Sequence, residues 1–213
     1  MNLNELKSII TRSFPDYLLT SETMFVKDKE KSVLSAFSFF ISLFFLFFLV
    51  YAIVNLIILN AGVGVPVAKQ IKAFTGLITF NLGYFLVQLL VIIIALHLLA
   101  LLFKKRANFS DSLKITFISS AYWMAMINLI ASLNVLLQSF MQAFALSQSM
   151  RTPGLIVSGI MFVWVAANGI RVLHGLSGMK SYCVATCTIL LAFLAGYFYG
   201  ELLFSQFFLV GSR

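Results

Sequence analysis

Five long apolar blocks run through the chain, and they leave few folds open to it. A bilayer core about 30 Å thick needs roughly 20 helical residues to cross it. The blocks predict spans at about 33–60, 73–103, 113–137, 154–173 and 182–204. Because a membrane span must pair its backbone groups internally, we expect residues 33–213 to form an all-α membrane domain, a five-transmembrane-helix bundle.

The composition argues against a water-soluble domain. Of the 213 residues, 61% are hydrophobic and only 10% are charged, and the mean hydropathy is +1.01. Soluble domains carry about 25% charged residues, and a chain of this length has too little interior to bury so many apolar side chains. The first apolar block is too long and starts too late for a cleavable signal peptide, so we expect it to be retained.

The Lys and Arg residues predict the orientation, because cytoplasmic loops carry an excess of them. The N-terminal segment and the second and fourth connections together hold eleven Lys and Arg residues. The first and third connections and the C-terminus together hold four. We therefore expect a multi-pass protein of the cell (inner) membrane, N-in/C-out, with the N-terminus in the cytoplasm. The eleven are Lys7, Arg12, Lys27, Lys29, Lys31, Lys104, Lys105, Arg106, Lys114, Arg171 and Lys180, and the four are Lys69, Lys72, Arg151 and Arg213.

Residues 1–32 form a short polar N-terminal segment before the first span. Its apolar residues recur at spacings of three and four, which predicts an amphipathic helix lying in the headgroup plane. Pro15 interrupts this pattern, and a loosely ordered tail is the alternative. The apolar positions are Leu3, Leu6, Ile10, Phe14 and Leu18.

Two histidines fall near the predicted cytoplasmic ends of their spans, His97 in the second and His174 in the fourth. Asp111, Arg171 and Lys180 belong to the same layer. Titratable groups in a membrane are costly and often functional, so this polar layer is a candidate for binding an anion or metal or moving a proton. The alternative is that each histidine hydrogen-bonds a neighbouring helix and fixes packing.

Two short patterns mark the last span. Cys183 and Cys187 are four residues apart, so they share one helical face. With His174 they make only a loose set of metal ligands, and we expect small-residue packing instead. Gly196 and Gly200 form a G-x-x-x-G motif, which indicates helix packing within the bundle or between two copies of the chain.

Familiar catalytic motifs are missing from the sequence. It contains no H-E-x-x-H, P-loop, G-x-S-x-G or paired intramembrane carboxylate. We therefore expect no enzyme activity, no cofactor and no metal. The net charge of +8 fits topology and anionic lipids better than nucleic acid. The expected partners are the lipid bilayer with its anionic lipids, a membrane or cytoplasmic protein, and, as an alternative, a second copy in a homo-oligomer.

The stretch from His97 to Lys180 resembles the bacterial branch of the Yip1 domain family. The resembling pieces are His97-Leu-Leu-Ala-Leu-Leu-Phe, the turn Asn108-Phe-Ser-Asp-Ser-Leu-Lys, and Arg171-Val-Leu-His-Gly-Leu-Ser-Gly-Met-Lys. The resemblance covers about four spans and implies a five-span integral membrane protein with its N-terminus inside.

The chain departs from the Yip1 pattern at three places. Lys104-Lys105-Arg106 replaces a double glycine, and Tyr122-Trp123-Met124 stands where a proline is common. The Asp-Leu-Tyr-Gly-Pro motif of the eukaryotic trafficking members is absent, so we do not carry over their binding to small GTPases.

These observations favour a non-enzymatic membrane subunit or adaptor. Its cytoplasmic face would comprise the N-terminal segment, the turn at Lys104 and the turn at Gly175. One alternative is a small transport or lipid-handling component, whose path lies between the polar third span and the spans that carry His97 and His174. A weaker alternative is a metal-dependent membrane enzyme that uses the histidines and cysteines. The polar residues of the third span are Ser119, Ser120, Asn128, Ser132 and Asn134.

Overall fold

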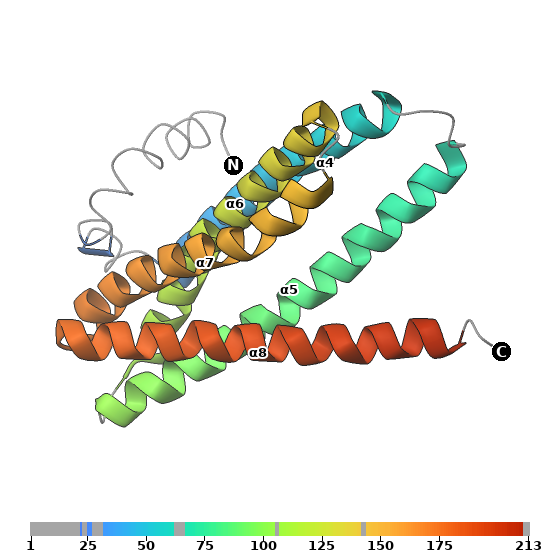
Figure 1. The fold of residues 1–213 in the computed structure, drawn as a ribbon. Helices are drawn as coiled ribbons and strands as arrows, with labels where there is room; N and C mark the ends of the chain where they lie inside the picture. Colours follow the sequence, from blue (N-terminus) through green and yellow to red (C-terminus); the bar gives the residue numbers. More distant parts are fainter. Residues whose placement is uncertain are drawn as a thin grey trace.

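The computed structural model describes residues 22, 25–26, 32–61, 67–104, 107–141 and 144–210. These form the helices α4 (Val33–Ala61), α5 (Val67–Phe103), α6 (Phe109–Met141), α7 (Phe144–Gly169) and α8 (Gly178–Val210), and the short π-helix η1 (Ile170–His174) that continues α7 (Figure 1). The predicted all-α fold class is confirmed.

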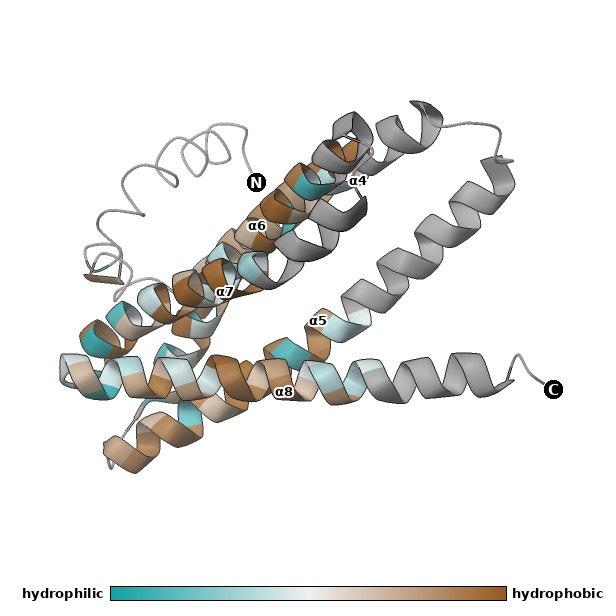
Figure 2. Ribbon diagram, viewed as in Figure 1, coloured by the Kyte–Doolittle hydropathy of each residue, from teal (hydrophilic) through white to brown (hydrophobic). Residues whose placement is uncertain are grey.

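Within the described residues, five helices are long and apolar enough to cross a membrane. Figure 2 shows apolar residues on parts of α5, α6 and α7 and in the middle of α8, with hydrophilic residues where α7 and α8 meet. The prediction of a five-helix polytopic membrane protein is therefore confirmed. The candidate spans are Val33–Val54, Gly83–Phe103, Phe109–Asn134, Pro153–His174 and Gly178–Gly200.

Four of the five helices begin earlier than the sequence predicted, and only α4 begins where it was expected, at Val33. α5 begins at Val67 rather than near residue 73, and α7 begins at Phe144 rather than at residue 154. The predicted connection 138–153 still lies almost entirely between two candidate spans, but much of it is helical, because α6 extends to Met141 and Pro153 lies inside α7. Hydropathy detects the part of a helix that suits the bilayer, and it misses a polar extension of the same helix.

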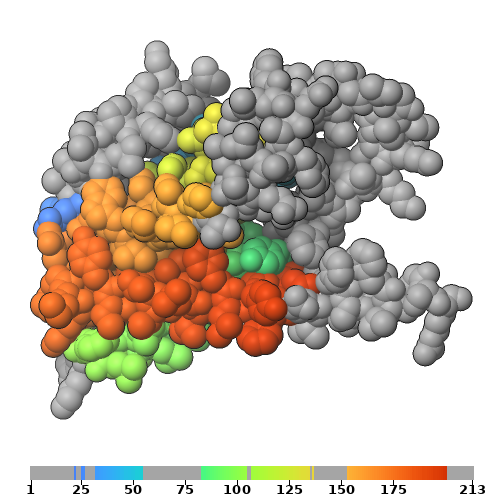
Figure 3. Space-filling model, in the orientation of Figure 1, coloured from blue at the N-terminus to red at the C-terminus, as the bar shows by residue number. Residues whose placement is uncertain are grey.

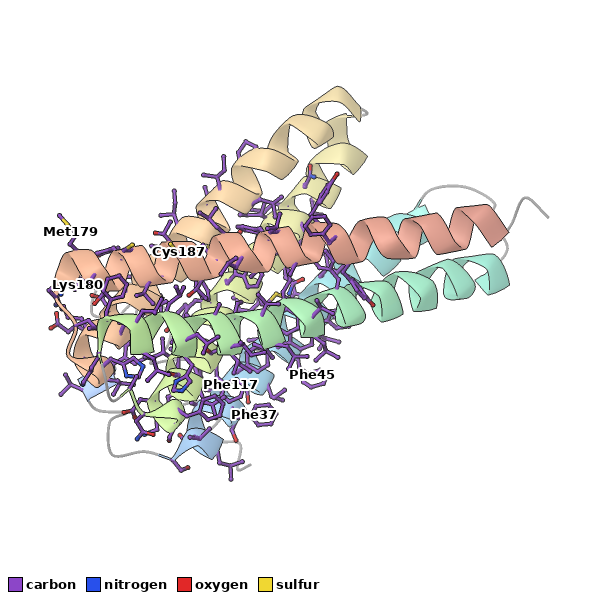
Figure 4. All side chains as sticks on the ribbon, turned by 90° about the horizontal axis from the view of Figure 1, so that it is seen from below. Phe37, Phe45, Phe117, Met179, Lys180 and Cys187 are labelled. Atoms are coloured by element: carbon purple, nitrogen blue, oxygen red, sulfur yellow. The ribbon has the colours of Figure 1, made fainter. Side chains whose placement is uncertain are left out.

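α6 is the central helix of the bundle. Of its span, 61% is buried, against 17% for the span of α4. It packs most extensively against α4 and α7, while α5 packs mainly against α8. α4, α6 and α7 therefore form one layer, and α5 and α8 lie side by side across it (Figures 1 and 4). α7 runs along α8 on the face shown in Figure 3.

Aromatic side chains join the two layers. Phe40 on α4 stacks on Phe85 of α5, with ring centroids 5.7 Å apart. Trp123 on α6 meets Phe193 of α8 edge-to-face across the layers at 5.8 Å, and it meets Phe162 of α7 within its own layer at 6.1 Å. Such pairs contribute roughly 0.5–1.5 kcal/mol each beyond the burial of area. These contacts link α4 to α5 and α6 to both α7 and α8.

Candidate functional site

One end of the bundle, here called the histidine end, collects the starts of α4, α6 and α8 and the ends of α5 and η1. Lys104, just after α5, donates a hydrogen bond of 2.5 Å from Nζ to the backbone oxygen of His174. η1 ends at Gly175, whose φ of 64° lies in the left-handed region that favours glycine. This turn brings the chain back to begin α8 beside α5.

Asn108 caps the start of α6. Its Oδ1 accepts a hydrogen bond of 3.1 Å from the backbone N–H of Ser110, a group that the helix leaves unpaired. Neither Ser110 nor Asp111 can be the cap, because α6 already begins at Phe109 and a cap must precede it. Asp111 lies in the first turn of α6, where the helix dipole stabilises a negative charge.

Ser112 joins the two histidines. Its Oγ lies 3.1 Å from Nδ1 of His97 and 3.1 Å from Nε2 of His174. A hydroxyl can donate one hydrogen bond and accept others, so it can serve both rings. His174 is only 1% exposed and Ser112 is fully buried. One hydroxyl therefore ties α5, α6 and η1 together.

The remaining residues of the predicted polar layer lie around this centre. Arg171 forms an ion pair with Glu22, and the two side chains are 43% and 52% exposed. Lys180 projects outward from the first turn of α8 (Figure 4). Asp111 is half-buried. The structure thus brings His97 and His174 together through Ser112, and leaves Arg171 and Lys180 at the rim.

Part of the N-terminal segment packs onto the histidine end. The Phe25 side chain is fully buried. A Cβ added at Gly169 would lie 2.7 Å from Cζ of Phe25 and 3.0 Å from Cγ1 of Ile115. Gly169 therefore provides the space that the Phe25 ring fills. The predicted amphipathic helix and its Pro15 lie outside the described residues.

The cysteines lie away from the histidines. Cys183 and Cys187 are free thiols on the exposed face of α8, where Figure 4 shows Cys187, whereas His174 is buried. Within the described part of the chain, no group of three or more His, Cys, Asp or Glu residues is placed to hold a metal ion. The described residues therefore offer no set of metal ligands for the alternative of a metal-dependent enzyme.

The two glycines of the G-x-x-x-G motif have different surroundings. A Cβ added at Gly196 would lie 2.6 Å from Nε2 of Gln88 and 2.7 Å from the Tyr84 hydroxyl, so α8 approaches α5 closely there. A Cβ added at Gly200 would meet no described atom within 4 Å. Of the two glycines, Gly196 is therefore the one at which α8 and α5 approach closely within one bundle.

A row of buried polar atoms without partners runs along α6. Thr116 Oγ1, Ser120 Oγ and Trp123 Nε1 have no hydrogen-bond partner among the described residues. Their spacings of four and three place them on one helical face, and Ser112 lies four residues before the first. A buried polar group left unpaired costs roughly 1–3 kcal/mol. By contrast, Ser119 donates to the Ile115 carbonyl of its own helix at 2.7 Å.

A pocket of about 360 Å³ lies between α4, α5, α6 and α7, far along these helices from the histidine end. Its polar lining includes two carboxamides, Gln88 and Asn128. Gln88 donates from Nε2 to the Ala192 carbonyl at 3.3 Å, whereas Nδ2 of Asn128 has no partner in the described part of the chain. From the sequence, Asn128 was expected only as a polar residue of the third span, and the pocket was not predicted.

Comparison of the chain with protein-family models, curated proteins and solved structures gave no match. The fold and the site therefore define a class, a polytopic membrane protein with five membrane-spanning helices, and assign no family. The resemblance to the Yip1 domain family stays a prediction.

Proposed function

We propose that the chain is a non-enzymatic membrane subunit or adaptor that acts by contact through the histidine end. The observation that carries the proposal is that three separate segments meet there. The N-terminal segment is held through Glu22 and Phe25, the turn after α5 through Lys104, and the end of η1 through His174. A surface that is held together before binding loses less entropy when a partner docks.

In the proposed orientation the histidine end faces the cytoplasm and the C-terminus lies outside, in the cell (inner) membrane. The excess of Lys and Arg in the connections at this end supports this orientation. The test is to place a single cysteine at Lys180 in a Cys183→Ser, Cys187→Ser background. In sealed vesicles an impermeant thiol reagent should label it from the cytoplasmic side only. Labelling from the outside would show that the protein has the opposite orientation.

The rim of the histidine end is suited to an acidic partner. Lys180 and Arg171 are exposed there, and Met179 beside Lys180 is exposed as well (Figure 4). Such a surface fits anionic lipid headgroups and an acidic segment of a protein partner. The pieces around His97 and His174 that resemble the Yip1 domain lie at the same end, and membership of that family is part of this proposal.

Affinity purification in a mild detergent tests the adaptor function. We expect a protein partner to be recovered in stoichiometric amount with the wild-type chain. Lys180→Glu should weaken its recovery, because the change reverses a charge at the rim. Leu190→Ala, an exposed position further along α8, serves as the matched control and should leave recovery unchanged. Repeated recovery of the chain alone would count against the proposal.

A second function, that of a small transport or lipid-handling component, is supported by the polar row on α6. This row continues from Ser112 into the bundle, and three of its atoms have no partner among the described residues. The test is translocation of a fluorescent phospholipid in proteoliposomes by His97→Ala and His174→Ala variants. Loss of translocation by protein that still accumulates would support this function. If both variants fail to accumulate, the histidines serve packing.

A further inference from the structure

We infer that the pocket between α4, α5, α6 and α7 binds one acyl chain of a phospholipid, and that the Asn128 side chain donates a hydrogen bond to the ester carbonyl of that lipid. The pocket is lined by Phe44, Phe45, Phe48, Tyr51, Tyr84, Phe85, Gln88, Met124, Ile127, Asn128, Ala131 and Leu155. The site lies away from the histidine end, and the inference does not rest on the adaptor function.

The walls of the pocket suit a hydrocarbon chain. They are mainly aromatic and aliphatic, and none of the described residues that line the pocket is charged. Phe45 at its edge is 60% exposed, and Leu155 is also exposed, so the pocket borders the surface that faces lipid. Its volume of about 360 Å³ falls in the range of roughly 300–1,000 Å³ typical of small-molecule sites.

Asn128 supplies the polar contact. Its side chain is only 8% exposed. Four buried side-chain atoms lack a partner in the described part of the chain, and only that of Asn128 belongs to a residue that lines the pocket. A buried donor without a partner is unfavourable, most of all in a membrane. A carbonyl oxygen on the bound molecule would satisfy it.

The depth of Asn128 identifies the acceptor. At 1.5 Å per residue, Asn128 lies about 28 Å along α6 from Phe109, close to the full thickness of a hydrocarbon core of roughly 30 Å. Tyr51 and Tyr84 line the same pocket, and tyrosine is enriched at membrane–water interfaces. Phospholipid ester carbonyls lie at this boundary. The acyl chain then runs from Asn128 inward toward Phe44.

Tryptophan fluorescence can detect the bound chain. The protein has two tryptophans, and Trp164→Phe leaves only Trp123, whose ring centroid is 6.5 Å from that of Phe85 in the pocket wall. A phosphatidylcholine brominated on one acyl chain is titrated into this variant in lipid-free mild detergent. We expect quenching of Trp123 that saturates at about one lipid per chain. Quenching that rises without saturation would overturn the inference.

Two changes in this background test the site itself. Ala131→Phe fills the pocket and should abolish saturable quenching. Asn128→Leu keeps the volume and removes the donor, so it should weaken binding roughly fivefold. Asn134→Leu, on the same helix but outside the pocket lining, should bind as the parent does. If Ala131→Phe does not elute as a single folded species, Asn128→Leu carries the test, and unchanged affinity in it would overturn the inference.

An ether-linked brominated lipid isolates the hydrogen bond, because it lacks the carbonyl acceptor. It should bind the parent roughly fivefold less tightly than the ester lipid. In the Asn128→Leu variant the two lipids should bind equally. A preference for the ester that survives in Asn128→Leu would show that Asn128 is not the donor.

Discussion

The histidine end and the pocket differ in how their polar side chains are satisfied. At the histidine end, Ser112 serves both histidine rings and Lys104 donates to the backbone oxygen of His174. In the pocket, which lies midway along α4, α5 and α6, Nδ2 of Asn128 has no partner among the described residues. The first arrangement packs three helical segments together, and we propose that the second serves a ligand that supplies an acceptor. The proposal of a ligand site therefore rests on an unsatisfied donor beside a cavity and not on a titratable residue.

The largest effect should come from the centre of the histidine end. Ser112→Ala leaves a nitrogen of His97 and one of His174 without the hydroxyl, and should lower the free energy of unfolding by about 3 kcal/mol. Thermal unfolding in mild detergent measures it. Ser119→Ala is the control, because that hydroxyl bonds only within its own helix, and we expect a loss of about 0.5 kcal/mol. Equal losses of unfolding free energy in the two variants would mean that Ser112 does not hold α5, α6 and η1 together.

A somewhat smaller effect is expected where the N-terminal segment packs. Gly169→Leu would displace the Phe25 ring and cost about 2 kcal/mol through overpacking. Limited proteolysis should then cut the N-terminal segment faster. Gly178→Leu is the control, since a Cβ added there meets no described atom within 4 Å. If the Gly169 variant is as resistant to protease as the wild type, Phe25 does not hold this segment.

The link between the turn after α5 and η1 should contribute less. Lys104→Met removes the donor to the His174 carbonyl while keeping an apolar stem, and we expect a loss of about 1 kcal/mol. Lys180→Met, at an exposed position on α8, should change stability very little. Thermal unfolding of the two variants side by side separates this hydrogen bond from the general effect of removing a positive charge.

The smallest effect should come from the ion pair at the rim. Arg171 and Glu22 are both about half exposed, and exposed pairs are screened by water and salt. Glu22→Gln should therefore cost no more than about 0.5 kcal/mol, and the difference should shrink further in high salt. A loss above about 1 kcal/mol that is insensitive to salt would place this pair among the contacts that define the histidine end.

Hydropathy and charge were enough to predict five membrane helices, because the bilayer imposes length and apolarity on each span directly. The depth of His97 and His174 also predicted a shared layer, and the structure places both rings on Ser112. Ser112 itself carried no signal, since serine is common in membrane helices. The π-helical turn of η1 depends on tertiary packing, and nothing in residues 170–174 marks it.

The surroundings of individual side chains on one helix could not be predicted from composition. The first span is rich in phenylalanine, which suggests lipid contact. Phe37 and Phe45 are indeed exposed (Figure 4), yet Phe40 of the same helix is buried in the core. The pocket was missed for the same reason, because it depends on how side chains from four helices meet.

Thermal unfolding of Asn128→Leu with and without phosphatidylcholine tests most directly whether the histidine end and the pocket differ as described. In lipid-free detergent we expect this variant to unfold at a higher temperature than the wild type, because it removes a buried donor that has no partner among the described residues. Added phosphatidylcholine should stabilise the wild type more than the variant. If Asn128→Leu is instead less stable than the wild type without lipid, or gains as much stability from lipid, the Asn128 side chain serves packing, as Ser112 does at the histidine end, and the pocket does not bind lipid through it.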